Sequence, residues 1–390
     1  MSIAFNSVVV HYDEIGLKGD NRSSFELLLI DNIKAKAKDL VTSITRESGQ
    51  ITINLKESVK EGETLERMKE VLEKMPGIAY FSFATKISNN IEEMKKHVLE
   101  LLKEKEFETF RISAERHDKN YPLTSGEMNV SLGSVVVDAL NKKVKLTNSD
   151  ISIKVEVNNK SAYLSLENVP GVGGLPVDAS QKVVALLSGG FDSPVAAFMM
   201  MKRGCEVVLV HFRNENQDSC GVEGKIRELA DKLSRFQPKT VLYTVLFGDI
   251  QREIIMKAKA ESRMLVYRRF MLRIASRIAD YNNAKFLVVG DSLSQVASQT
   301  LTNLEATYKD SPKPVFSPLI GMNKKEIMVI SKRIGTHDIS AQPYGDCCSY
   351  FLPKHPVLRA RSEDLDKVES DFDMEALIEK AAKEAIIEKF

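Results

Sequence analysis

The stretch Leu186-Leu187-Ser188-Gly189-Gly190-Phe191-Asp192-Ser193-Pro194 joins an apolar segment to an amphipathic one. Residues 182–187 have the composition of a strand buried on both faces, and residues 193–203 predict a helix. In open α/β folds, ligands bind where such a strand ends and the next helix begins. Small residues there let backbone N–H groups and a helix N-terminus approach an anion. The stretch therefore predicts a phosphate-binding loop.

This loop is neither of the two commoner nucleotide loops. It lacks the Gly-Lys-Ser/Thr ending of a Walker A loop and the spacing of a dinucleotide fingerprint. The hydroxyls of Ser188 and Ser193 add hydrogen-bond donors. The carboxylate of Asp192 would repel a phosphate directly. We therefore expect it to contact the phosphate through a bridging magnesium ion, or to orient a neighbouring group. An ordinary glycine-rich turn remains the alternative interpretation.

Outward from the loop, apolar strands alternate with helices, which favours a doubly wound parallel sheet. The strands are predicted at 182–187, 206–212, 240–246 and 285–290, and the helices at 193–203, 222–236 and, with a break, 250–280.

The chain before residue 175 consists of two smaller α/β units. Strands predicted at 8–12, 50–55 and 78–84, with helices at 24–40 and 64–74, favour a ferredoxin-like α+β fold. Helices at 91–103 and 125–140, a strand at 110–114 and a hairpin over 151–157 and 161–166 form the next unit. A glycine- and proline-rich connector at 170–176 marks the main boundary. The predicted domains are 1–86, 87–170, 171–361 and a charged helical tail, 362–390.

Composition narrows the class of protein. The chain has 390 residues, 43% hydrophobic and 28% charged, which suits two or three globular domains. The net charge of +1 gives no overall positive field, so any nucleic-acid site must come from local clusters. Apolar stretches are far shorter than the roughly 20 residues that span a bilayer. The N-terminus has no signal pattern, and four cysteines make no disulfide scaffold, so we expect a cytoplasmic protein without membrane contact.

Ser-Gly-Gly-x-Asp-Ser at 188–193 resembles the pyrophosphate loop of the N-type ATP pyrophosphatases, which transfer AMP to a substrate oxygen. Further motifs follow in colinear order at 12–22, 267–271, 290–300 and 346–354. Together, from about residue 8 to 356, they resemble the tRNA 4-thiouridine synthetase (tRNA sulfurtransferase) family. The resemblance implies a ferredoxin-like domain, a THUMP domain that in the family can begin nearer residue 60, and a domain that carries the pyrophosphate loop (a PP-loop domain).

The resemblance implies an ATP-dependent sulfurtransferase that uses Mg²⁺ and acts on tRNA. Adenylation of uridine 8 would turn its O4 into a good leaving group, and a cysteine persulfide would then give 4-thiouridine, releasing AMP and pyrophosphate. Three alternatives stay open: another PP-loop enzyme that thiolates RNA or amidates a substrate, sulfur transfer to a sulfur-carrier protein of thiamine synthesis, and a non-catalytic RNA-binding module.

ATP contacts are expected from two groups of residues. The loop would hold the phosphates through Ser188, Gly189, Gly190 and Ser193. The resemblance adds contacts to adenine and ribose from Leu186, Leu187, His211, Phe212, Arg268, Gly290 and Gln299. The resemblance also gives catalytic roles to Asp192 and to Lys325, a cation that would stabilise the leaving pyrophosphate, although Lys324 is adjacent.

The resemblance assigns the sulfur carrier to Cys348 and a resolving thiol to Cys347. It assigns tRNA contacts to basic residues of the first two domains: Lys18, Arg22, Arg111, Arg116, His117 and Lys119. Residues 264–267 lack the Cys-x-x-Cys pair of one family branch, so we expect no iron–sulfur cluster and no other metal held by the protein. The rhodanese-like domain of many relatives is also expected to be absent. The sulfur donor, a cysteine desulfurase or another persulfide or sulfide source, is left open, as is a homodimer.

Overall fold

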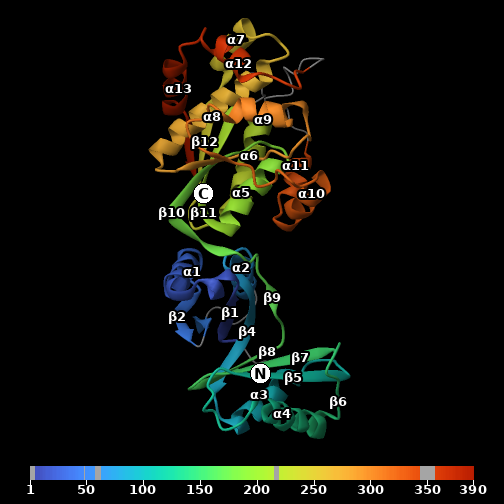
Figure 1. Ribbon diagram of the computed structural model, residues 1–390. Helices are drawn as coiled ribbons and strands as arrows, with labels where there is room; N and C mark the ends of the chain where they lie inside the picture. Colours follow the sequence, from blue (N-terminus) through green and yellow to red (C-terminus); the bar gives the residue numbers. More distant parts are fainter. Residues whose placement is uncertain (1–4, 48, 58–62, 215–218, 343–355) are drawn as a thin grey trace. The chain divides into compact units, whose positions relative to one another are not determined.

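The computed structural model describes residues 5–47, 49–57, 63–214, 219–342 and 356–390. The backbone divides into two compact units, Met1–Pro176 and Val177–Phe390, each built around its own sheet. Figure 1 shows their helices and strands. No helix in these ranges has the length and apolar character needed to cross a membrane.

The first half of unit 1 has the strand–helix–strand–strand–helix–strand order of a ferredoxin-like fold. Its elements are β1 (Ser7–Tyr12), α1 (Arg22–Ala37), β2 (Val41–Glu47), β3 (Gln50–Leu55), α2 (Glu63–Glu73) and β4 (Ile78–Ser88). The strands lie in the order β2-β3-β1-β4 with antiparallel neighbours. This part of the fold prediction is confirmed, but β2 was not predicted.

The second half of unit 1 packs two helices on a mixed group of strands. Its elements are α3 (Ile91–Leu102), β5 (Thr109–Arg116), α4 (Ser125–Leu140), β6 (Lys143–Val144), β7 (Ile151–Val157), β8 (Ser161–Ser165) and β9 (Val169–Pro170). The antiparallel pairing of β7 with β8 confirms the predicted hairpin. A capping box between Thr124 and Glu127 fixes the start of α4, because it satisfies backbone groups that the first turn leaves unpaired.

Strand β4 belongs to both halves of unit 1. Residues from Ile78 to Ala84 pair with β1, and residues from Ala84 to Ser88 pair with β8. One sheet therefore runs through the whole unit.

Unit 2 is a three-layer α/β structure. Its elements are β10 (Leu175–Leu186), α5 (Asp192–Lys202), β11 (Arg203–Arg213), α6 (Ser219–Ser234), β12 (Val241–Leu246), α7 (Gly248–Lys257), α8 (Arg263–Tyr281), β13 (Phe286–Val288), α9 (Leu301–Tyr308), β14 (Val315–Phe316), α10 (Lys324–Arg333), α11 (His337–Ala341), α12 (Ser362–Glu369), α13 (Met374–Lys383) and β15 (Ile386–Lys389). The sheet order is β14-β13-β10-β11-β12-β15. Parallel pairing of β10 with β13, β13 with β14 and β11 with β12 confirms the predicted parallel sheet.

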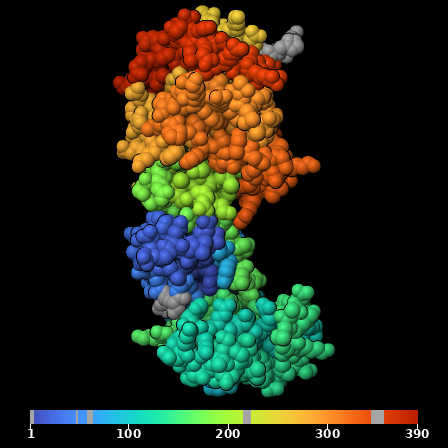
Figure 2. Space-filling model, in the orientation of Figure 1, coloured from blue at the N-terminus to red at the C-terminus, as the bar shows by residue number. Residues whose placement is uncertain are grey.

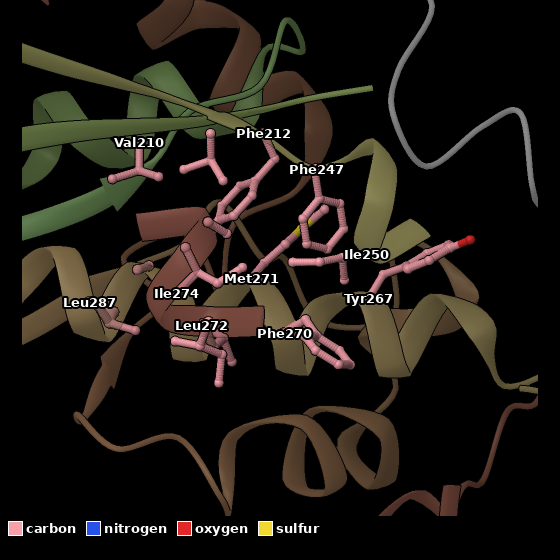
Figure 3. Close-up of a cluster of buried hydrophobic side chains, with 14 of the residues drawn as sticks. Val210, Phe212, Phe247, Ile250, Tyr267, Phe270, Met271, Leu272, Ile274 and Leu287 are labelled. Carbon is pink, nitrogen blue, oxygen red and sulfur yellow. The ribbon is translucent and has the colours of Figure 1, made fainter. Parts of the chain in front are cut away.

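One core of unit 2 lies between the sheet and α8, and further buried side chains come from α5 and α6. Figure 3 shows aromatic side chains from β11, from the start of α7 and from α8 gathered in this core. The rings of Phe212 and Phe247 meet edge to face, with centroids 5.3 Å apart. This packing fixes the end of β11 against the helix layer.

The C-terminal segment is an integral part of unit 2. Arg269 of α8 is 1% exposed and forms ion pairs with Asp310, with Asp366 and with Glu369. Strand β15 then pairs antiparallel with β12. Figure 2 shows this segment, in red, on the surface of the unit. The sequence predicted a helical tail without β15, because this strand is held by backbone pairing and not by an apolar pattern.

Candidate active site

A cavity of about 410 Å³ opens at the ends of β10, β11 and β13 in unit 2. The volume falls in the range of small-molecule sites. Its wall includes many of the residues predicted to bind ATP or to act in catalysis: Leu186, Leu187, Ser188, Asp192, Ser193, His211, Phe212, Arg268, Gly290 and Gln299. A larger cavity of about 680 Å³, beside α7 and α13, contains none of them.

The strand order explains why the cavity lies there. β10 is flanked by β11 on one side and by β13 on the other, so the chain reverses its direction of travel across the sheet at β10. Crevices at such switch points are the usual ligand sites of doubly wound sheets. The glycine loop follows β10 and leads directly into the N-terminus of α5.

The hydroxyl groups of the loop hold the loop itself. Ser193 Oγ accepts a hydrogen bond from Ser188 N at 2.8 Å and donates to Ser188 O at 3.2 Å. Ser188 Oγ accepts from Gly190 N at 3.3 Å. The sequence suggested that both hydroxyls serve a ligand; the structure gives them a shaping role in the turn.

Gly290 allows β13 to end directly on the N-terminus of α5. A Cβ atom at this position would lie 2.8 Å from Ser193 N and 2.9 Å from the carbonyl carbon of Asp192. Both neighbours are backbone atoms that cannot rotate away. A side chain at this position would therefore displace the glycine loop.

Asp192 is held by two side chains from other parts of unit 2. Its Oδ1 lies 2.6 Å from Lys324 Nζ, and its Oδ2 accepts a hydrogen bond from Gln295 Nε2 at 2.9 Å. The Lys324 ammonium also lies 5.3 Å from the centre of the Phe191 ring. A lysine, a carboxylate and the N-terminus of α5 are thus brought together at the glycine loop.

The start of α10 determines which lysine reaches the loop. Asn323 and Glu326 form a capping box, which places Lys324 and Lys325 at the first two positions of the helix. Successive helical residues point about 100° apart, so the two side chains diverge. Lys324 turns toward Asp192, whereas Lys325 is exposed. The catalytic role assigned to Lys325 stays a prediction, and Lys324 is the lysine that the sequence left as the alternative.

His211 and Phe212 end β11 beside the loop. His211 Nδ1 lies 2.9 Å from Leu187 O; because a carbonyl oxygen only accepts, Nδ1 carries the proton of this contact. The Phe212 side chain belongs to the core (Figure 3), so a ligand contact from this residue is expected to use its backbone.

Arg268 and Gln299 are joined on the cavity wall by a residue that the sequence did not single out. Asp291, 5% exposed, forms an ion pair with Arg268 and accepts hydrogen bonds from Tyr308 and, at 2.9 Å, from Gln299 Nε2. Asp291 belongs to the family motif at 290–300, but its partners are not adjacent to it in the sequence and are identified only by the structure. Gln295, in the same motif, was likewise not singled out.

The predicted RNA contacts near the N-terminus are tied to their surroundings. Arg22 Nε donates to Tyr12 Oη at 2.9 Å and lies 3.0 Å from Glu26. Burial, together with the hydrogen bond to Glu26, raises the pKa of Tyr12 to about 12. The Lys18 ammonium lies 5.0 Å from the centre of the Phe25 ring.

The predicted contacts in the second half of unit 1 lie on two sides of β5. Side chains alternate along a strand, so Arg111 and Arg116 face opposite sides. Arg116 donates to the carbonyls of Lys119 and Tyr121, and Lys119 is exposed. Arg111 donates to Ser152 and to the Leu146 carbonyl. The structure therefore groups Arg116 with Lys119 and separates both from Arg111.

His117 turns its buried Nε2 toward a buried carboxylate. Its Nε2 lies 3.5 Å from Glu156 Oε2, and Glu156 Oε1 lies 3.2 Å from His11 Nε2 and 2.8 Å from Lys154 Nζ. Burial alone would raise the pKa of Glu156, but the neighbouring rings of His11 and His117 and the charge of Lys154 lower it well below its usual range.

Glu115, His117 and Glu156 have ligand atoms within 4.8 Å of one another, as a metal site would. Lys154 Nζ lies 3.9 Å from Glu115 as well as 2.8 Å from Glu156. Its ammonium already supplies the positive charge, so this group carries no metal assignment.

Cys347 and Cys348 lie outside the described residues. The chain just before them is anchored: buried Lys225 donates to the carbonyls of Ser340 at 3.1 Å and of Gln342 at 2.8 Å. Ser340 Oγ in turn donates to Gly190 O at 3.2 Å. The segment that leads to the two cysteines is therefore attached to the glycine loop.

Comparison with known families accounts for most of the chain. The profile of the thiamine biosynthesis protein (ThiI) family matches residues 178–374, that of the THUMP domain residues 88–167, and that of the ThiI ferredoxin-like domain residues 7–82. A probable tRNA sulfurtransferase of Caldanaerobacter subterraneus subsp. tengcongensis is 38% identical over 97% of this chain and 98% of its own length. The chain belongs to the tRNA sulfurtransferase family.

Two more similarities extend the comparison. A probable tRNA sulfurtransferase of Thermus thermophilus is 40% identical over 96% of this chain and 91% of its own length. The crystal structure of a 4-thiouridine synthetase–RNA complex with bound ATP matches with a TM-score of 0.88 and 34% identity, covering 99% of this chain and all of that one. The tRNA sulfurtransferase fold is thus present throughout, as a ferredoxin-like domain, a THUMP domain and a parallel-sheet PP-loop domain.

Proposed function

We propose that this chain is an ATP-dependent tRNA sulfurtransferase that converts uridine 8 to 4-thiouridine. The observation that carries the proposal is the 410 Å³ cavity at the switch point of a PP-loop sheet, in a chain that belongs to this family over its full length. ATP fits the residues present: the wall combines a glycine loop, the N-terminus of α5, the guanidinium of Arg268 and a buried amide oxygen of Gln299 without a hydrogen-bond partner in the described chain.

In the first half-reaction, uracil O4 forms a bond to the α-phosphorus of ATP and pyrophosphate leaves. Backbone N–H groups of the loop and Lys324 stabilise the negative charge that develops on the phosphates. Asp192 holds Lys324 in place, and its carboxylate would hold a magnesium ion, whose charge would neutralise phosphate charge. Lys325, the lysine that the family resemblance indicated, is the alternative for the same role.

In the second half-reaction, persulfide sulfur on Cys348 bonds to C4 and AMP leaves. A thiol, from Cys347 or from a second molecule, then cleaves the S–S bond and is oxidised to a disulfide with Cys348, leaving sulfur on C4. The anchored segment from Ser340 to Gln342 supports delivery of the cysteines to the glycine loop. A persulfide donor such as a cysteine desulfurase would recharge Cys348 after reduction of the disulfide.

Arg22, Lys18, Arg111, Arg116, His117 and Lys119 are proposed to hold the RNA through phosphate contacts. Arg116, at the end of β5, donates to the carbonyl of Lys119, which places these two residues together, whereas a ring nitrogen of His117 turns toward Glu156.

The test is reconstitution of the purified chain with tRNA transcript, ATP, magnesium and sulfide. Expected products are AMP, pyrophosphate and 4-thiouridine at position 8, the last measured by mass spectrometry of digested tRNA. Chelation of magnesium is expected to stop AMP release. Formation of a different thiolated nucleoside would favour another PP-loop thiolase, and absence of AMP would favour a non-catalytic RNA-binding protein.

A further inference from the structure

Asp291 is a buried carboxylate on the wall of the cavity, and the mechanism above gives it no part. It follows Gly290 at the end of β13 and is 5% exposed. One oxygen pairs with Arg268 and accepts the Tyr308 hydroxyl, and the other accepts Gln299 Nε2 at 2.9 Å. Tyr308 Oη also lies 3.0 Å from Ser317 Oγ. Two residues expected to contact ATP, Arg268 and Gln299, are thus held by one side chain.

The partners of Asp291 favour the ionised carboxylate, because Arg268 forms an ion pair with it and Tyr308 and Gln299 both donate to it. Burial would raise the pKa of Asp291, but the charge of Arg268 and the hydrogen bonds from Arg268, Tyr308 and Gln299 lower it. An ionised carboxylate has no proton to donate. Every neighbour must therefore turn a donor toward it.

This requirement fixes the orientation of the Gln299 amide. An amide has a donor end and an acceptor end, and only the Nε2 end can face Asp291. The Oε1 end then points away from the carboxylate, and this atom is buried without a hydrogen-bond partner among the described residues. Buried acceptors in native proteins are nearly always satisfied, so the orphaned oxygen of a cavity-lining residue indicates a donor on the ligand.

We propose that Asp291 is a positioning residue that fixes the Gln299 carbonyl toward the nucleotide, so that the cavity selects a ligand that donates a hydrogen bond there. The inference rests on the proposed function, because it requires ATP in this cavity. The phosphates of ATP only accept from a protein, which leaves two kinds of donor: the 6-amino group of adenine and the ribose hydroxyls. Either would satisfy Gln299, and the experiment separates them.

The experiment measures equilibrium binding of ATP, 2′-deoxy-ATP, 3′-deoxy-ATP and purine riboside triphosphate, which lacks the 6-amino group, by calorimetry without tRNA. The native chain is expected to bind one of the three analogues about 5- to 100-fold more weakly than ATP, the effect of leaving one buried acceptor unpaired. In Asp291→Asn, the amide of Gln299 can rotate, so this ratio should fall to about 2-fold or less while ATP itself binds at least about 5-fold more weakly.

Two further variants keep the test independent of folding. Gln299→Met removes the acceptor but leaves the pairing of Asp291 with Arg268. Its preference for ATP over the analogue should fall as it does in Asp291→Asn. Tyr308→Phe removes one donor to Asp291 and should keep the ratio. In the steady state, Asp291→Asn should raise KM for ATP more than it lowers kcat.

The outcomes separate the two proposals. If the native chain binds ATP, and Asp291→Asn and Gln299→Met both keep the native ratio of ATP affinity to analogue affinity, the positioning role alone is overturned. A native chain that binds no ATP would overturn the proposed function and this inference with it.

Discussion

Glu156 in unit 1 and Asp291 in unit 2 are both buried carboxylates whose pKa is lowered by their neighbours, but they face different surroundings. Glu156 lies among His11, Lys154 and His117, which come from β1, β7 and the end of β5, so its contacts join strands. Asp291 faces a cavity and leaves an amide oxygen unsatisfied there. The comparison teaches that burial, a lowered pKa and an unpaired polar atom do not by themselves mark a site, because Glu156 Oε2 is also buried without a hydrogen-bond partner among the described residues; the cavity beside Asp291 makes the difference.

The sharpest way to break this comparison is to remove the third relevant carboxylate, Asp192. Asp192→Asn is expected to lower AMP formation by about 1,000-fold, because Lys324 loses its charged partner at the phosphates. AMP release is measured with tRNA present, and tRNA affinity should stay within about 2-fold. Asp338→Asn, at an exposed carboxylate of the same unit, is the control. Retention of a tenth of the native rate would refute the role.

Glu156→Gln tests the opposite side of the comparison. The substitution leaves the Lys154 ammonium, 12% exposed, without its nearest carboxylate, and should lower the free energy of unfolding of unit 1 by about 3 kcal/mol. Hydrogen exchange of β1 and β7 in urea measures the change. The control Glu92→Gln breaks an exposed pair with Lys95 and should cost no more than about 1 kcal/mol. ATP affinity should not change, and a loss of ATP binding would contradict the separation.

Lys324 and Lys325 offer a matched pair within unit 2. Lys324→Met should lower kcat for AMP formation by about 100-fold, since the ammonium that contacts Asp192 is lost. Lys325→Met should lower it by less than about 3-fold, because an exposed charge is screened by solvent. Single-turnover AMP formation gives both rates. The reverse ranking would assign the role to Lys325.

The stability that Glu156 contributes should depend on pH. The pKa of Glu156 is below its ordinary 4.5 in the folded chain, so the unfolded chain takes up the proton first as pH falls. Stability from this group is present above about pH 4.5 and is lost below it, at up to about 1.4 kcal/mol per pH unit. Urea denaturation between pH 6 and pH 3 should show a shallower loss in Glu156→Gln than in the native chain. Parallel curves would mean that other groups cause the acid sensitivity.

The smallest effect is expected from a single basic residue of unit 1. Arg111→Ala should weaken tRNA binding about 5-fold and reduce the slope of log affinity against log salt by about 1, as loss of one phosphate contact would. Arg67→Ala, at an exposed residue paired with Asp39, is the control. Filter binding over a range of salt concentrations measures both. An unchanged slope would exclude a phosphate contact by Arg111.

Much of the fold follows from the sequence, which does not predict β2, β15 or the two-residue strands β6, β9 and β14. The apolar run that forms β10 and the alternating hairpin β7–β8 carry their pattern in their side chains. β2 and β15 lie at sheet edges, where backbone pairing with one neighbour suffices and the side-chain pattern is weak.

The candidate site divides in a similar way. The loop motif leads directly to the cavity, because the positions of a phosphate loop are contiguous in the chain. The choice between Lys324 and Lys325 depends on where α10 begins, and the role of Asp291 depends on Tyr308 and Arg268, which other helices supply. Contacts of that kind are set by tertiary packing, which adjacent letters do not reveal.

The shared strand β4 has a practical consequence for anyone who wishes to study the two halves of unit 1 apart. Cleavage or truncation between residues 82 and 88 would remove β4 from one side of β8, leaving only β7 beside it, and would uncover a row of unsatisfied N–H and C=O groups. Such an open edge recruits other chains. Fragments ending there should therefore aggregate, whereas fragments ending near Pro176, between the two compact units, should remain dispersed.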